Sequence, residues 1–218
     1  EFRKLIDKLV DMGVSKNIMI TLSTNGTHYN DKLIDKIVGN FENLGFNISL
    51  DGVEEKFDYL RHGDNWDNVK SNLDKFYKLH TENDHVNINV THTVSVWNFF
   101  YLRDFHLYFE TNYPEFLIWN NLVHFPEWCE ANVVPGLTKY VIADRVKHPE
   151  DFGLPAWDEG KYNKDISPLV EHALTDSTEE HWQKFLEQVN AGDVYRNESF
   201  EDTFTELYNI VKGDMISI

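Results

Sequence analysis

Residues 46–73, FNISLDGVEEKFDYLRHGDNWDNVKSNL, decide the fold because they open with an unusually polar strand pattern. Asn47, Ser49 and Asp51 alternate with apolar residues, so the three polar side chains share one side of the predicted strand. A strand buried on both faces of a parallel sheet is usually a continuous apolar run. Because burying such polar groups without partners costs several kcal/mol, this side must meet water, a polar network or a polar ligand.

Strand and helix patterns alternate on both sides of this stretch. Residues 17–22 form a short apolar run, strict alternation starts at His85, and residues 115–125 form a further strand pattern. Four strands that alternate with helices predict an α/β fold with a parallel sheet. Gly13 and Gly45 are expected to end the first two of the intervening helices. These helices are predicted from apolar residues at helical spacing in segments 2–10, 33–41, 66–76 and 99–109.

The strand predicted after His85 repeats the same polarity. In HVNINVTHTVSVWN, residues 85–98, Val, Ile and His side chains share one face, while Asn, Thr and Ser side chains share the other. Ligands of βα folds bind at the carboxyl ends of the strands, where TNG, residues 24–26, and SLDG, residues 49–52, both fall. The pattern therefore favours a polar ligand at this end of the sheet. The alternative is the exposed face of an open antiparallel sheet.

Composition and charge exclude several kinds of partner. The chain has 218 residues and a formal net charge of −17, and it shows no basic stripe of the kind that nucleic acid or anionic lipid requires. No segment has the length and apolarity of a membrane span or a signal peptide, so no membrane partner is expected. A single cysteine allows no disulfide framework, which predicts a reducing cytoplasmic location. Cys129 is the only cysteine, and one thiolate cannot by itself hold an iron–sulfur cluster or a structural zinc.

The character of the sequence changes after residue 125. Four of the six prolines lie between Pro126 and Pro155, which predicts an irregular segment. Two helices are expected after it, at about residues 177–190 and 199–212. We therefore divide the chain into an α/β part, residues 1–125, and an irregular and helical C-terminal part, residues 126–218.

Three segments carry a resemblance to a known family: ITLSTNGT at residues 20–27, the SLDG strand and the helix after it at residues 47–79, and VNINVTHTVSVWN at residues 86–98. The most specific part is a strand that ends in Ser-Leu-Asp-Gly and is followed by Arg61, a glycine, a tryptophan and an Asn-Leu helix. Together, residues 2–98 closely resemble the middle and later strands of radical S-adenosylmethionine (radical SAM) enzymes. The branch they are most similar to is grouped with SPASM and twitch-domain proteins.

The resemblance implies an incomplete parallel (β/α) barrel, formed by the later strands of a partial (β/α)6 barrel, with a helical C-terminal appendage. In that family the barrel holds SAM above a [4Fe–4S] cluster, and reduction of the cluster cleaves SAM to a radical that removes hydrogen from a substrate. Ser49 and Asp51 would bond the methionyl or ribose part of SAM, beside the TNG turn. No catalytic residue and no metal ligand is assigned. The implied SAM-binding residues are Thr24, Asn25, Gly26, Ser49, Asp51 and Asn98.

The sequence departs from the family pattern at its beginning. The family's Cys-x3-Cys-x2-Cys motif and its Gly-Gly-Glu-Pro-like segment are both missing, because the chain starts at the helix that should follow the second strand. We therefore expect an upstream portion that carries the cluster ligands, and we expect this chain alone not to perform radical chemistry. Its substrate, a small molecule or a peptide, is not fixed by the residues. With Cys129 alone, an auxiliary cluster is also excluded.

Two other functions compete with this interpretation. The chain could be a non-catalytic binding or partner module on a truncated α/β scaffold. It could also be a metal-dependent hydrolase, with ligands drawn from His92, His124, Glu127 and Asp51, although no metal-ligand spacing is present.

Two further expectations concern an arginine and a sheet edge. Arg61 is expected to pair with Asp58 or Glu55. The strand at residues 18–22 would lack a partner on one side, so we expect self-association through that sheet edge, or a segment that covers it.

Overall fold

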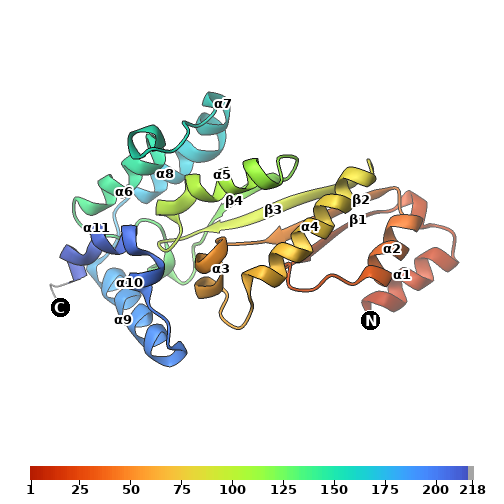
Figure 1. Cartoon of the computed structure of the whole chain (residues 1–218), viewed down its shortest axis with the longest axis horizontal. Helices are drawn as coiled ribbons and strands as arrows, with labels where there is room; N and C mark the ends of the chain where they lie inside the picture. The colour runs from red at the N-terminus through yellow and green to blue at the C-terminus, as the bar shows by residue number, and fades with distance from the viewer. Residues whose placement is uncertain (216–218) are drawn as a thin grey trace.

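The computed structural model describes residues 1–215, and its centre is a parallel sheet in the order β1-β2-β3-β4 (Figure 1). All three strand pairs are parallel, which confirms the predicted α/β fold and rules out the antiparallel alternative for this sheet. The strands are β1 (Met19–Thr24), β2 (Asn43–Ser49), β3 (Val86–Val94) and β4 (Leu117–Leu122).

The two faces of the sheet differ in chemistry. Register pairs Ser23 with Asn47 and Asn47 with Asn89, and it pairs Ser49 with Thr91, so hydrophilic side chains stand next to one another across neighbouring strands. We call this side the open face, because its residues are half-buried or exposed. The open face consists of Thr21, Ser23, Asn47, Ser49, Asn89, Thr91, Thr93, Trp119 and Asn121.

The opposite side, which we call the covered face, is apolar and packed beneath helices. Ile48 and Val90 on this face have no exposed surface. They belong to one core cluster with apolar residues of α2 (Asp31–Asn40), α4 (Trp66–Glu82) and α5 (Leu102–Asn112). Because side chains alternate in direction along each strand, the sheet has one solvent-accessible face and one buried face.

Most of the helices after β4 lie beyond the carboxyl ends of the strands, at the opposite end of the molecule from the N-terminus, whereas α7 (Glu159–Lys161) lies beside α5 (Figure 1). The C-terminal helices pack around a second cluster, in which Trp182, Phe185 and Phe204 are buried. Tyr59 Oη joins this region to α3 (Glu54–Leu60) by donating a 2.8 Å hydrogen bond to Asp193 Oδ1. No helix among residues 1–215 is long and apolar enough to cross a membrane. The remaining helices are α1 (Phe2–Asp11), α3 (Glu54–Leu60), α6 (Thr138–Lys147), α7 (Glu159–Lys161), α8 (Ser167–Ala173), α9 (Glu179–Arg196), α10 (Phe200–Thr203) and α11 (Thr205–Met215), with short helical turns η1 (Ser15–Asn17), η2 (Phe99–Tyr101), η3 (Glu127–Cys129), η4 (Pro149–Phe152) and η5 (Tyr162–Ile166).

The prediction that Gly45 ends a helix is wrong. Helix α2 ends at Asn40, whose side-chain amide donates to the Lys36 carbonyl oxygen at 2.8 Å, and Phe41 is already extended. Gly45 lies inside β2 instead, opposite Thr21, and a Cβ atom there would be 3.2 Å from Thr21 Oγ1. The glycine therefore marks a close approach of two strands.

The segment after Pro126 is also more regular than predicted. It contains α6, whose Ile142 and Val146 are buried and whose Arg145 donates to the Phe100 carbonyl oxygen at 2.6 Å. Pro126, Pro135 and Pro155 lie between the helical elements, and Pro149 is the first residue of η4, so none of them interrupts a hydrogen-bond ladder. The high proline content of this segment therefore reflects the boundaries between several short helices.

Candidate functional site

The open face offers hydrogen-bonding groups that the chain itself uses only in part. The Asn89 side-chain amide donates to Asn47 Oδ1 at 3.0 Å, which links β2 and β3. One step further along the same two strands, Ser49 and Thr91 are half-buried register partners, and neither hydroxyl makes a side-chain hydrogen bond within residues 1–215. These hydroxyls are therefore free to bond water or a polar ligand.

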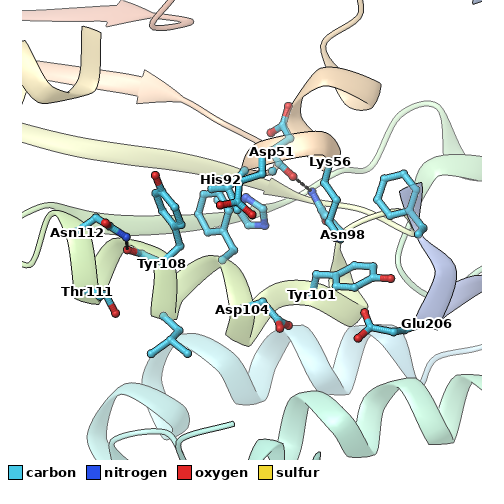
Figure 2. Close-up of a pocket in the computed structure, with 16 residues that line it drawn as sticks. Asp51, Lys56, His92, Asn98, Tyr101, Asp104, Tyr108, Thr111, Asn112 and Glu206 are labelled. Atoms are coloured by element: carbon cyan, nitrogen blue, oxygen red, sulfur yellow. Dashed lines mark hydrogen bonds between the residues drawn. The ribbon is translucent and has the colours of Figure 1, made fainter. Parts of the chain in front are cut away.

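The carboxyl ends of β2 and β3 are tied together by Asp51 and Asn98 (Figure 2). Asp51 Oδ1 accepts a hydrogen bond from the backbone N–H of Thr93 at 3.1 Å. Asn98 Nδ2 donates to the carbonyl oxygens of Asp51 and Thr93, each at 2.9 Å, and Asn98 Oδ1 accepts from the N–H of Ser95. Two residues that the sequence assigned to one site thus lie together, and both are already engaged in fixing the strand ends.

Arg61 completes this network, and its predicted partners are wrong. Its guanidinium donates to Asp51 Oδ2 at 2.5 Å. The two expected partners have other roles: Asp58 Oδ1 accepts from the N–H of Trp66, and Glu55 pairs with Lys56. A pair ten residues apart in sequence forms here because α3 folds back towards the end of β2.

The TNG turn is set apart from Ser49 and Asp51. Thr24 is the register partner of the buried Ile48, so it belongs to the covered side, and its hydroxyl accepts from the N–H of Gly26. Gly26 has a φ of +78°, which favours glycine, and its carbonyl oxygen accepts from the buried Asn72. Asn25 is exposed, and its side-chain oxygen accepts from Thr27. The turn is therefore held by its own hydrogen bonds and by α4.

Some members of the open face are absent from the sequence-based assignment. Ser23, rather than Thr24, stands beside Asn47 on this face. Trp119 and Asn121 extend it on β4, as register partners of Thr91 and Thr93. The strict alternation of β3 could have indicated which residues share its face, whereas the short strands β1 and β4 needed the register to do so.

A cavity of about 440 Å³ lies on the other side of the sheet, at the same strand ends (Figure 2). Asp51, just after β2, and Asn98, at the start of η2, lie at its border, and Tyr101 and Tyr108 line it from η2 and α5. Lys56 Nζ lies 4.5 Å from the centre of the Tyr101 ring, a cation–π distance. The cavity mixes aromatic surface with a few charged groups, as small-molecule sites do.

His92 is the buried titratable group of this cavity. Its Nδ1 lies 3.0 Å from the Leu50 carbonyl oxygen, and its ring stacks on Phe105 with centroids 4.0 Å apart. Its Nε2 is buried without a hydrogen-bond partner. Burial lowers the pKa of His92 from its ordinary value near 6.5 to about 4, against the opposing effect of the nearby Asp51 carboxylate. The imidazole is therefore neutral at pH 7.

The predicted hydrolase ligands do not form one metal group among residues 1–215. His92 is on the covered face under Phe105, as its place among the valines indicated. His124 instead lies near Glu130 and His172.

The resemblance implies two cofactors, SAM and a [4Fe–4S] cluster, and the residues of this chain suit only the first. Cys129 is buried and alone, and burial raises the pKa of its thiol to about 12, so the chain cannot ligate a [4Fe–4S] cluster. The hydroxyls and amides of the open face match the hydroxyl, amine and carboxylate groups of SAM in donor and acceptor chemistry. SAM therefore fits the chemistry of this face, whereas the cluster does not fit the chain.

Comparisons with family models and with curated proteins find no match. Among solved structures, the chain is partly similar to anSMEcpe. Native anSMEcpe with bound AdoMet aligns with a TM-score of 0.48 and 17% identity, over 75% of this chain and 44% of that chain. Native anSMEcpe with bound AdoMet and the Cp18Cys peptide aligns with a TM-score of 0.45 and 16% identity, over 68% and 42%. This chain spans less than half the length of these structures, and similarity at this level assigns no family, ligand or reaction.

Proposed function

We propose that this chain supplies the later strands of a radical SAM barrel and that its open face forms part of the SAM pocket. The proposal rests first on the resemblance of residues 2–98 to that family. It rests second on one observation, the unpaired and half-buried hydroxyls of Ser49 and Thr91 on adjacent parallel strands. Because the chain has a single cysteine, the proposed role is to bind and orient SAM, and the radical reaction needs ligands from outside this chain.

The proposed contacts follow from the chemistry of the open face. The Ser49 and Thr91 hydroxyls can each donate and accept, which suits the ribose hydroxyls and the methionyl carboxylate of SAM. Trp119 is the register partner of Thr91 and is 54% exposed, so its ring is accessible for stacking with an adenine base. Asp51 is assigned a positioning role, because its carboxylate already accepts from Arg61 and Thr93.

A second candidate function is a binding module that uses the cavity beneath the sheet. Two observations favour it: the unpartnered Nε2 of His92, and the φ of +55° at Glu54, which lines the cavity. A strained backbone at a non-glycine residue is found most often at functional sites. In this case the ligand contacts the covered side, and the open face carries only water.

Equilibrium dialysis of the purified chain against labelled SAM tests the two candidates together. The first predicts saturable binding that the double variant Ser49→Ala/Thr91→Val weakens by at least about fivefold, because each lost hydrogen bond costs about 1 kcal/mol. The matched control is Tyr108→Phe, which changes one hydroxyl at the cavity and should leave SAM binding unchanged.

Two results contradict the proposal. One is a chain that shows no saturable SAM binding up to millimolar concentration while its circular dichroism shows a folded α/β protein. The other is binding that Tyr108→Phe weakens and the open-face variant does not, which transfers the ligand to the cavity. Circular dichroism of each variant separates loss of binding from loss of fold.

A further inference from the structure

Three side chains outside the proposed SAM pocket lie close enough to share one metal ion. One ligand atom each from His124, Glu130 and His172 lies within 4.8 Å of the other two. They come from three separate segments: the loop after β4, the residue that follows η3, and the last turn of α8. The fold alone brings them together, because 48 positions separate residue 124 from residue 172.

His172 and Glu130 form the inner part of this group. His172 Nε2 is buried and has no hydrogen-bond partner, although Glu130 Oε2 lies only 3.1 Å away. Both side chains are mostly shielded, at 20% and 17% exposure. A buried imidazole nitrogen and a carboxylate oxygen that lie within ion-pair distance, yet form no hydrogen bond, make an arrangement that a shared cation satisfies.

His124 closes the group from the solvent side. Its ring stands edge-on to that of His172, with centroids 5.7 Å apart, and it is exposed. Tetrahedral zinc with bonds of about 2.0–2.1 Å places its ligand atoms about 3.4 Å apart. The 3.1 Å separation of His172 and Glu130 is near that value, and the exposed His124 needs only a small side-chain movement to reach it.

We propose that His124, Glu130 and His172 form a Zn²⁺ site with three protein ligands and a fourth position open to solvent. Two imidazoles and one carboxylate favour zinc and similar divalent transition metals over Ca²⁺ and Mg²⁺, which prefer oxygen ligands. The ion fastens α8 to the loop that follows β4, so it couples the C-terminal helices to the end of the sheet. This site does not depend on the proposed SAM pocket.

The test is a titration of the full 218-residue chain with Zn²⁺ as the only added metal ion. A chromophoric chelator competes with the protein for the zinc and reports the amount that the protein binds. We expect one equivalent to bind and the melting temperature to rise with zinc, because a ligand of the folded state stabilises it. His124→Ala and Glu130→Gln should each weaken zinc binding at least tenfold. Since His124 is exposed, its variant is expected to fold normally.

Two histidine variants serve as controls. His28→Ala removes another exposed histidine and should leave zinc affinity unchanged. His181→Ala removes a neighbouring imidazole that faces Glu127 at 3.7 Å, and it too should change affinity by less than twofold.

A second spectroscopic measurement addresses the ligand geometry. Co²⁺ bound in place of Zn²⁺ should give the strong visible absorption of a four-coordinate site, and His124→Ala should abolish it. The proposal is overturned if the chain binds zinc no more tightly than His124→Ala does. It is also overturned if His181→Ala weakens binding as much as His124→Ala, since the ligand set would then be wrong.

Discussion

The open and covered faces of one sheet are made by the same strands, yet they have opposite requirements. Val90 on the covered face has no exposed surface and packs in a core with aromatic side chains of α4 and α5. Its neighbour Thr91 points to the open face, where its hydroxyl has no partner within residues 1–215. The covered face therefore buries the apolar surface that drives folding, whereas the hydroxyls of the open face that have no partner are available to a ligand.

The largest difference in stability is expected when one residue on each face is changed. Val90→Asp buries a charge without a partner and should destabilise the chain by about 4 kcal/mol or more, enough to unfold it. Thr91→Val replaces a hydroxyl that has no partner by a methyl group on the half-exposed side, and should change stability by less than about 1 kcal/mol. Urea unfolding followed by circular dichroism measures both. Similar losses for the two variants would show that the faces are energetically equivalent.

A pH titration probes the covered face through His92. Its folded pKa, about 4, lies below the unfolded value near 6.5, so the unfolded chain binds the proton more readily. Stability is therefore fully present above about pH 6.5 and falls as the pH drops towards 4, by about 3 kcal/mol in total.

His92→Gln provides the comparison, because it removes this titration while the carboxylates remain. The difference in unfolding free energy between the two proteins should shrink as the pH falls from 6.5 to 4. His106 is a second buried imidazole, with a pKa lowered to about 2 by burial and by the charges of Lys161 and His92. Because folded His106 stays neutral between pH 6.5 and 4 in both proteins, it contributes equally to them over this range. A constant difference across this range would mean that the ring of His92 is solvated.

Asp51 connects the ends of β2 and β3, where the two faces of the sheet meet. Asp51→Ala removes the Arg61 pair and the hydrogen bond to Thr93, and the partly buried guanidinium then loses its carboxylate. We expect a loss of about 1–3 kcal/mol in thermal unfolding. Glu55→Ala, which breaks an ion pair with a 60% exposed carboxylate, should cost less than about 0.5 kcal/mol. Equal losses would make the Asp51 network an ordinary surface pair.

The smallest expected effect concerns the edge of the sheet. Strand β1 has β2 as its one strand neighbour within residues 1–215, as predicted, and Met19 at its start is 74% exposed. We expect weak dimerisation of the chain along this edge, and a second copy paired there would extend the open face. Thr21→Lys should abolish the dimer in sedimentation equilibrium. A monomer at all concentrations would contradict the expectation.

The sequence was most informative where strands alternate strictly. In β3 the period of two correctly separates Val90 and His92 from Thr91, and in β2 it separates Ile48 from Ser49. It was less informative in the short strand β1, where the register and not the pattern shows that Ser23 stands beside Asn47 on the open face and Thr24 beside Ile48 on the covered face.

Contacts between distant segments could not be predicted from local pattern. The Arg61–Asp51 pair depends on α3, a short helix that the sequence did not indicate. The grouping of His124 and His172 depends on the packing of α8 near the end of β4, which no sequence spacing encodes. These contacts between distant segments therefore become visible only in the tertiary structure.

The most direct test of the central claim is amide NMR of the chain as SAM is added. The account predicts that the largest chemical-shift changes fall on the open face, at Asn47, Ser49 and Thr91 and their strand neighbours. Changes confined to His92, Tyr108 and other residues of the cavity beneath the sheet, or no changes at millimolar SAM, would contradict it.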